Sequence, residues 1–268
     1  MVARARHRDP ARYAPGRVVR PGRVLIDLHC HALPGVDDGP ATQAEALALL
    51  RGAVAAGTTT VVATPHCSAR YPTSAAAVAE GVAEMRVVLA AAGVALDLRR
   101  GAEIALDMAM ELPDEELRLL TLGGSRCVLL ESPLEPAVGG TLERCVEDLH
   151  DRGYRVLLAH PERAPAFLDQ PLRLRALVEA GVRCSVTAAA LAGWFGEGPH
   201  WYALELLRDG LVHSIDSDAH DPELRPPGML EGLHAATDAL PHVAARIGWL
   251  TTDLPAALLA DERLPPAP

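Results

Sequence analysis

The sequence predicts an α/β fold of the parallel-barrel type. Strand-like stretches recur seven times in the 268 residues, helix-like stretches separate them, and ionisable side chains follow the ends of nearly all the strands. Strands that alternate with helices are typical of a parallel sheet, and seven repeats in a chain of this length favour a barrel. An open doubly wound sheet is the alternative, but it would need a glycine-rich phosphate loop after the first strand, where the chain has His29-Cys30-His31.

The predicted strands are short runs that are rich in apolar and β-branched residues. In chain order they cover Val24–Leu28, Thr59–Ala63, Leu96–Arg100, Cys127–Leu130, Arg155–Ala159, Arg183–Val186 and His213–Ser217. The predicted helices between them cover Thr42–Ala56, Thr73–Ala92, Thr141–Arg152, Pro171–Ala180 and Pro199–Arg208. A glycine stands just beyond each helix, where a left-handed C-terminal cap is expected: Gly57, Gly93, Gly153, Gly181 and Gly210.

Composition limits both the core and the partners. Aromatic residues make up only 3% of the chain, so we expect a core of Ala, Val and Leu. The formal net charge of −10 argues against general nucleic-acid binding, because that needs a basic surface. The five cysteines have no CxxC spacing, which indicates reduced thiols and a cytoplasmic protein. We expect no stable insertion into a membrane.

No linker or shift in composition divides the central part of the chain, so we expect one barrel domain over residues 24–262. Residues 1–23 contain seven arginines and one aspartate without an apolar segment. We interpret them as a disordered leader, with docking on an acidic or membrane partner as the alternative. Residues 263–268 form a proline-rich tail, and the oligomeric state is left open.

Histidines and carboxylates that follow the predicted strands are the strongest functional signal. His29 and His31 lie two residues apart at a strand end, so both imidazoles point to one side and can reach one divalent metal ion. The other candidates are Asp37, Asp38, His66, Glu103, Glu131, His160, Asp218 and His220. In a parallel barrel the C-terminal strand ends form one rim, where catalytic groups converge. We therefore predict a metal site at this rim.

Each candidate also has an ordinary structural interpretation. A single histidine such as His66 usually caps or hydrogen-bonds, and Asp37 or Asp38 before a Gly-Pro pair could simply form a turn. Glu131 and Asp218 could likewise be a loop charge and a turn cap. Five histidines and at least four carboxylates at one rim would nevertheless be costly to bring together without a cation.

Six short segments then occur in an order that is typical of one enzyme family. They are Asp27-Leu28-His29-Cys30-His31, Leu33-Pro34-Gly35-Val36-Asp37-Asp38-Gly39-Pro40, Ala63-Thr64-Pro65-His66, Gly101-Ala102-Glu103-Ile104, Ala159-His160-Pro161-Glu162-Arg163 and Ser217-Asp218-Ala219-His220. Together they resemble the PHP (polymerase and histidinol phosphatase) superfamily, and within it the bacterial CpsB/CapC-like metal-dependent protein-tyrosine phosphatases. The resemblance covers residues 24 to about 230.

The resemblance implies a distorted TIM-like (β/α)7 barrel of PHP type with three divalent ions per chain. Mn²⁺ is the expected metal, and Fe, Zn, Co or Mg are alternatives. The implied ligand sets are His29, His31, Glu103 and Asp218 for one ion, Glu103, Glu131 and His160 for a second, and Asp38, His66 and His220 for a third. Arg163 and Arg225 match the family's phosphate-binding arginines.

These residue types suit the hydrolysis of phosphate monoesters. Clustered divalent ions lower the pKa of a bound water and bind phosphoryl oxygens, and arginine forks two donors onto a phosphate. We therefore expect in-line attack by metal-bound hydroxide on phosphotyrosine, without a covalent enzyme intermediate. The expected partner is a phosphotyrosine protein, namely the tyrosine-rich tail of a kinase that governs exopolysaccharide export, or another phosphomonoester. A cysteine-dependent mechanism is disfavoured, because no cysteine is followed by five residues and then an arginine.

Two competing functions remain. One is a small-molecule phosphatase of the same superfamily, such as histidinol-phosphate phosphatase, and the other is a non-catalytic, metal-bound regulatory module. The Gly-Val-Asp-Asp-Gly-Pro element at 35–40 favours the tyrosine class, and the complete ligand set argues against a degenerate module. The family often has basic residues after the histidine at 66 and amide residues near 184–187, and this chain departs from both patterns. These departures weaken the expectation that the substrate is a phosphotyrosine peptide.

Overall fold

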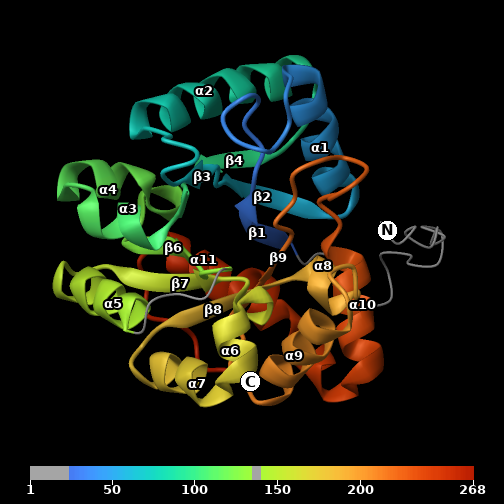
Figure 1. Ribbon diagram of the computed structural model, residues 1–268. Helices are drawn as coiled ribbons and strands as arrows, with labels where there is room; N and C mark the ends of the chain where they lie inside the picture. The colour runs from blue at the N-terminus through green and yellow to red at the C-terminus, as the bar shows by residue number, and fades with distance from the viewer. Residues whose placement is uncertain (1–23, 135–139) are drawn as a thin grey trace, which may run out of the picture.

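The computed structural model describes residues 24–134 and 140–268, and its strands form a ring that helices surround (Figure 1). The seven predicted strands are confirmed as β1 (Leu25–Cys30), β2 (Thr58–Ala63), β4 (Asp97–Arg100), β6 (Cys127–Glu131), β7 (Arg155–Ala159), β8 (Arg183–Thr187) and β9 (Ser214–Asp216). Two short strands, β3 (His66–Cys67) and β5 (Glu103–Ile104), follow β2 and β4. The leader predicted at 1–23 lies outside the described residues, and the domain boundaries stay predictions.

The five predicted helices are confirmed as α1 (Gln43–Ala55), α2 (Ala75–Ala91), α5 (Thr141–Asp151), α7 (Pro171–Glu179) and α9 (Glu197–Arg208). The glycine beyond each helix has a positive φ, between 66° and 107°, as the predicted caps require. The described residues contain further helices that were not predicted: α3 (Leu106–Glu111), α4 (Asp114–Leu120), α6 (Pro165–Asp169), α8 (Ala188–Leu191), α10 (Met229–Ala239) and α11 (Leu254–Leu259). No helix in the described ranges is long and apolar enough to cross a membrane.

All strand pairs in the described chain are parallel, which confirms the barrel. β1 pairs with β2, β2 with β4, and the series continues from β5 through β6, β7 and β8 to β9. Parallel strands require a crossover between neighbours, and helices on the outside provide these crossovers: the five predicted helices for most pairs, and α3 and α4 between β5 and β6. All the C-terminal strand ends therefore face the same rim.

Strands β2 and β4 are interrupted just before this rim, and this interruption distorts the barrel. Pro65 has no N–H to donate, and a Cβ on Gly101 would lie only 2.9 Å from Val62 Cγ1, so only glycine fits beside β2. The chain resumes as β3 and β5, which pair with each other and place His66 opposite Glu103. The strands consequently form two hydrogen-bonded sets, β1-β2-β4 and β3-β5-β6-β7-β8-β9.

The ring closes between β9 and β1. Cys30 forms a parallel bridge with Ala219, and the N–H of His31 donates to the carbonyl of Ala219 over 2.8 Å. The N–H of Asp218 donates to the carbonyl of His29, also over 2.8 Å. Backbone bonds at the closure thus fix the two segments that carry four of the predicted ligands.

Buried carboxylates reinforce the closure one layer below the rim. Asp216 Oδ1 accepts from the N–H of Leu28 at 2.7 Å, and Asp27 accepts from the N–H of Ser217 at 3.0 Å and from its hydroxyl at 2.6 Å. Burial and the nearby Asp216 raise the pKa of Asp27 to about 7. The free-energy cost of burying these carboxylates is offset because each one accepts hydrogen bonds from backbone donors of the other segment.

The core is aliphatic, as the composition predicts, and His213 is part of it. Leucine, valine and alanine supply most of the fully buried side chains. His213 is buried just before β9, where its Nδ1 accepts from the N–H of Cys184 at 3.2 Å. Burial, together with the charge of Arg183, lowers the pKa of His213 to about 3 from its ordinary value of 6.5.

This shift makes the fold sensitive to acid. Between pH 6.5 and about 3 the unfolded chain binds a proton at His213 that the folded chain excludes, so stability falls as pH falls. The cost is up to about 1.4 kcal/mol per pH unit. We expect His213→Asn, which keeps an acceptor for Cys184, to flatten the fall in Tm between pH 6.5 and 4 relative to wild type. Parallel Tm profiles for the two proteins would contradict this prediction.

Candidate active site

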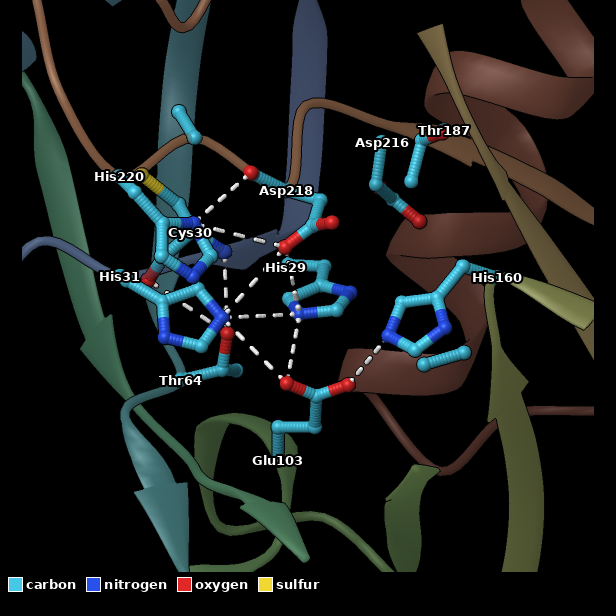
Figure 2. A network of polar contacts seen from close by, with 12 residues as sticks. His29, Cys30, His31, Thr64, Glu103, His160, Thr187, Asp216, Asp218 and His220 are labelled. Carbon is cyan, nitrogen blue, oxygen red and sulfur yellow. Dashed lines mark hydrogen bonds and ion pairs between the residues drawn. The ribbon is translucent and has the colours of Figure 1, made fainter. Parts of the chain in front are cut away.

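The C-terminal rim brings the predicted residues together around one polar cavity, and Figure 2 shows the polar contacts of several of them. The cavity has a volume of about 230 Å³. It is lined by Asp38, His66, Ser68, Arg70, Tyr71, Glu103, Glu131, Leu134, His160, Arg163, Asp218, His220 and Arg225. His29 and His31 are 1% and 0% exposed and form its floor. All nine candidate ligands and both candidate arginines therefore converge.

The floor of the site is a compact group at the end of β1. His29 Nε2 and His31 Nε2 lie 3.2 Å apart, and Glu103 Oε2 is 3.3 Å from the first and 3.4 Å from the second. Asp218 Oδ1 approaches the same two nitrogens at 3.4 and 3.5 Å. Figure 2 shows these four side chains directed toward a common centre. Two nitrogens and two carboxylate oxygens in this arrangement suit one divalent ion.

Asp37 fixes the orientation of His31. Its Oδ2 lies 2.6 Å from His31 Nδ1 and accepts from the N–H of His66 at 2.9 Å, while Oδ1 accepts from the N–H of Gly39 at 2.9 Å. A proton on Nδ1 that is held by this carboxylate leaves the lone pair of His31 Nε2 free for a metal. Asp37 thus forms the turn and also supports a candidate ligand.

A second group lies around Glu131 at the end of β6. Its ligand atoms are within 4.8 Å of those of Glu103 and His66. His160 Nε2 lies 2.6 Å from Glu103 Oε1. The grouping differs from the implied set in that His66, and not His160, joins Glu103 and Glu131, whereas His160 contacts Glu103 Oε1.

A third group lies at the open side of the cavity. Ligand atoms of His31, Asp38, His66 and His220 are within 4.8 Å of one another. Asp38 Oδ1 is 3.6 Å from His66 Nε2 and 3.4 Å from His220 Nε2. The geometry contains the set implied by the family resemblance and adds His31 to it.

The two arginines approach the cluster from one wall. Arg163 and Arg225 both donate to Asp218 Oδ2, at 2.7 and 2.6 Å. Their guanidinium carbons lie 4.5 and 5.9 Å from the centre of the Phe195 ring, at a distance suited to cation–π contact. Phe195 and the carboxylate therefore hold both cations in place.

Backbone strain coincides with the site. Among the described residues, three that are not glycine have positive φ, and two of them are His160 (35°) and Asp218 (49°). Such conformations cost of order 1–3 kcal/mol and persist where the surrounding structure enforces them. His160 directly follows β7 and Asp218 lies two residues after β9, so the strained backbone is found where each candidate ligand meets the cavity.

The charges of the cluster favour a bound cation. Burial alone would raise the pKa of Glu103, but the facing His29 and His160 imidazoles hold it well below its usual range. Burial and the Glu103 charge raise the pKa of Glu131 to about 7. Adjacent carboxylates of this kind repel each other unless a positive charge lies between them.

Unpartnered atoms test whether these residues fit a metal. Glu103 Oε2 and His220 Nε2, which belong to residues that line the cavity, are buried and have no hydrogen-bond partner. Buried polar atoms are normally satisfied, so two such atoms in one cavity are typical of a ligand-binding site. Histidine and carboxylate donors are those that manganese, iron and zinc accept. The residues therefore fit a divalent metal.

Three supporting residues were not predicted from the sequence in these roles. Asp37 was a candidate for the site or for a turn, and its role toward His31 depends on a side-chain direction that spacing does not give. Phe195 could have been found only because aromatic residues are rare in this chain. The carboxylate of Glu162 accepts from the N–H and the hydroxyl of Thr187, both at 2.8 Å, and so connects the turn after β7 to β8.

The fold and the site together define the class of this protein. It is a TIM-like barrel protein that carries the histidine and carboxylate ligands of a metal centre at its C-terminal rim. The family model described as capsular polysaccharide synthesis, CpsB/CapC, matches residues 25–245. The chain belongs to this CpsB/CapC family.

Two curated relatives agree with the assignment. Tyrosine-protein phosphatase YwqE of Bacillus subtilis (strain 168) is 32% identical over 248 residues, which cover 91% of this chain and 96% of that protein. Tyrosine-protein phosphatase CpsB of Streptococcus pneumoniae is 28% identical over 246 residues, which cover 89% of this chain and 99% of the relative.

Solved structures agree as well. A structure from work on YwqE of Bacillus subtilis and CpsB of Streptococcus pneumoniae, described as unique metal-dependent tyrosine phosphatases, superposes with a TM-score of 0.82. It is 30% identical, and the match covers 91% of this chain and 99% of that chain. The β-aspartyl dipeptidase of Fervidobacterium islandicum AW-1 reaches a TM-score of 0.54 at 14% identity over 88% of this chain and 72% of its own, so the likeness is one of fold.

The contact between Asp37 and His31 predicts a measurable effect on metal binding. Asp37→Asn places an amide NH₂ opposite either His31 or a backbone N–H, so His31 loses its orientation. We expect the affinity for divalent metal to fall about 10–100-fold, measured by titration of metal-free protein with Mn²⁺. The control is Asp148→Asn, which changes an exposed carboxylate on α5. Equal affinities in the two variants would contradict the orienting role.

Proposed function

We propose that this protein is a metal-dependent phosphatase that hydrolyses phosphotyrosine on proteins. The observation that carries the proposal is the pair Arg163 and Arg225, which stand beside a cluster of histidines and carboxylates in one cavity. The relatives YwqE and CpsB, which are named tyrosine-protein phosphatases, support the same reaction.

The proposed cofactor is three divalent ions, with Mn²⁺ as the first choice. The ligands would be the nine histidine and carboxylate residues of the cluster: His29, His31, Asp38, His66, Glu103, Glu131, His160, Asp218 and His220. The three close groups and the unpartnered atoms of Glu103 and His220 support this assignment. Bound ions would activate water for attack and neutralise charge on the phosphoryl group.

The arginines would bind and orient the phosphate. Each guanidinium has five N–H donors, and the contacts to Asp218 use only some of them. Arg225 Nε is buried without a hydrogen-bond partner, so a phosphoryl oxygen would satisfy it. Hydrolysis then forms a bond from a water oxygen to phosphorus and breaks the bond to the tyrosine oxygen.

The proposed substrate is a tyrosine-phosphorylated kinase that regulates exopolysaccharide production. The family's description as capsular polysaccharide synthesis supports this choice. Tyr71, stacked on His66 with ring centres 5.6 Å apart, gives the cavity an aromatic wall beside which a phenyl ring can lie. We place the reaction in the cytoplasm, which suits five cysteines that are all free thiols.

The first test is direct. The protein loaded with Mn²⁺ should hydrolyse p-nitrophenyl phosphate and phosphotyrosine peptides, and either EDTA or His160→Ala should reduce both rates to background. The control is His242→Ala, which removes an exposed histidine. Turnover of a small metabolite without turnover of the peptides would overturn the substrate, and a protein that neither contains metal nor responds to it would overturn the site.

The proposed role of the arginines in phosphate binding leads to a separate prediction. We expect Arg163→Ala to lower kcat/KM roughly 100-fold, because one donor to the charged transition state is lost. Metal content should stay near that of wild type, because Arg225 still holds Asp218. Steady-state kinetics and elemental analysis measure the two effects, with the exposed Arg118→Ala as control. Loss of metal from the Arg163 variant would contradict a role in phosphate binding.

A further inference from the structure

A second cavity opens directly beside the polar one. It has a volume of about 200 Å³ and lies between α8, the loop after α8, and the segment before α10. Its lining is mostly apolar and consists of Ala188, Ala189, Ala192, Trp194, Phe195, Ser217, Asp218, Leu224, Arg225, Pro226, Gly228 and Glu231. This composition contrasts with the histidines and carboxylates of the first cavity.

The two cavities meet at the phosphate-binding wall. Asp218 and Arg225 line both of them, and Phe195, which lines the second cavity, lies beneath the guanidinium of Arg163. A group held in the second cavity would therefore sit next to a phosphate held by the arginines. This continuity connects the apolar cavity to the substrate of the first one.

The distribution of aromatic residues points to the same place. The chain has three tryptophans and two phenylalanines, and two of these five residues, Trp194 and Phe195, line this cavity. Trp194 is 44% exposed and Leu224 is 78% exposed, although both are large apolar side chains. Exposed apolar side chains that gather at a cavity are typical of a binding surface.

Size decides what the cavity can hold. Pockets for drug-sized ligands measure about 300–1,000 Å³, and this cavity of about 200 Å³ is smaller. It is suited to one amino-acid side chain. Apolar side chains make up most of the wall, and the charged residues Asp218, Arg225 and Glu231 complete it.

We propose that this cavity binds an apolar side chain that neighbours the phosphotyrosine in the substrate protein. The proposal rests on the function proposed above and adds a specificity subsite to it. The phosphate anchors the substrate at Arg163 and Arg225, and burial of the neighbouring side chain between Trp194 and Leu224 selects among phosphorylated tyrosines. Free phosphotyrosine lacks this second group.

The test uses phosphotyrosine peptides that differ at one position. Each peptide carries leucine at one of the three positions on either side of the phosphotyrosine, with glycine and serine elsewhere, and the reference peptide has no leucine. We expect wild type to prefer leucine at one position by about tenfold in kcat/KM, the scale of discrimination by an apolar pocket. Equal kcat/KM values for all peptides would overturn the subsite.

Two variants connect the preference to the cavity. Leu224→Ala removes one wall, and Ala189→Leu fills the space; both should reduce the preference for leucine to near unity. Leu172→Ala is the matched control, because Leu172 is 77% exposed and lies on α7 outside the cavity lining. A preference that survives in Leu224→Ala would overturn the proposal even if Ala189→Leu fails to fold.

The outcomes separate this proposal from the function it depends on. If wild type hydrolyses none of the peptides, the phosphotyrosine phosphatase function fails. If wild type hydrolyses them all at the same rate, that function stands and the subsite fails. If Leu224→Ala slows p-nitrophenyl phosphate as much as the leucine peptide, the cavity serves the phenyl ring itself, which also overturns the proposal.

Discussion

Closure of the barrel between β1 and β9 is the constraint on which the site depends. Asp216 on β9 accepts from the backbone of β1, and Asp27 on β1 accepts from the backbone after β9. These carboxylates are fully buried, and burial raises the pKa of both. Two buried acids would be a poor choice for stability alone, since apolar residues would pack there without desolvation cost. Their contacts instead fix the positions of the ligand-bearing residues one step further along each chain segment. The register between β1 and β9 in this layer therefore determines the geometry of the ligands at the rim.

The interruption of β2 and β4 likewise positions candidate ligands at the rim. A regular barrel would carry β2 and β4 straight to the rim. The close approach of Gly101 to Val62 and the missing donor of Pro65 interrupt both strands together, and the chain resumes with His66 paired to Glu103. Glu103 then faces His29, His31, His66 and His160 at distances of 2.6 to 3.4 Å. A single carboxylate that reaches four imidazoles would suit a ligand shared between neighbouring ions of the proposed metal centre.

The sequence predicts the strands and the rim residues well because both follow local rules. Alternation of strand and helix identifies the seven repeats, and position after a strand identifies the candidate ligands without knowledge of the fold. Features that arise from contacts between distant segments escape such rules. The short helices α3, α4, α6 and α8 have too few residues for a recognisable period. The interruption at Gly101 depends on Val62, which is 39 residues away, and the choice between Asp37 and Asp38 depends on which carboxylate turns toward His31. Phe195 lies in a loop, where no periodicity predicts that it will contact two arginines.

Asp218 links the two halves of the proposed chemistry. Its Oδ1 faces the imidazoles of the floor, and its Oδ2 accepts from both arginines. Burial would raise the pKa of this carboxyl, but the surrounding His29, His31 and Arg225 hold it well below its usual range, so it stays charged. Asp218 therefore joins the imidazoles of the floor to the arginines of the wall. The left-handed backbone at Asp218 is the local cost of this shared position. Because one side chain contacts both groups, a phosphate bound by the arginines, as proposed, would be held in a fixed place relative to the proposed metal ligands, which in-line attack would require.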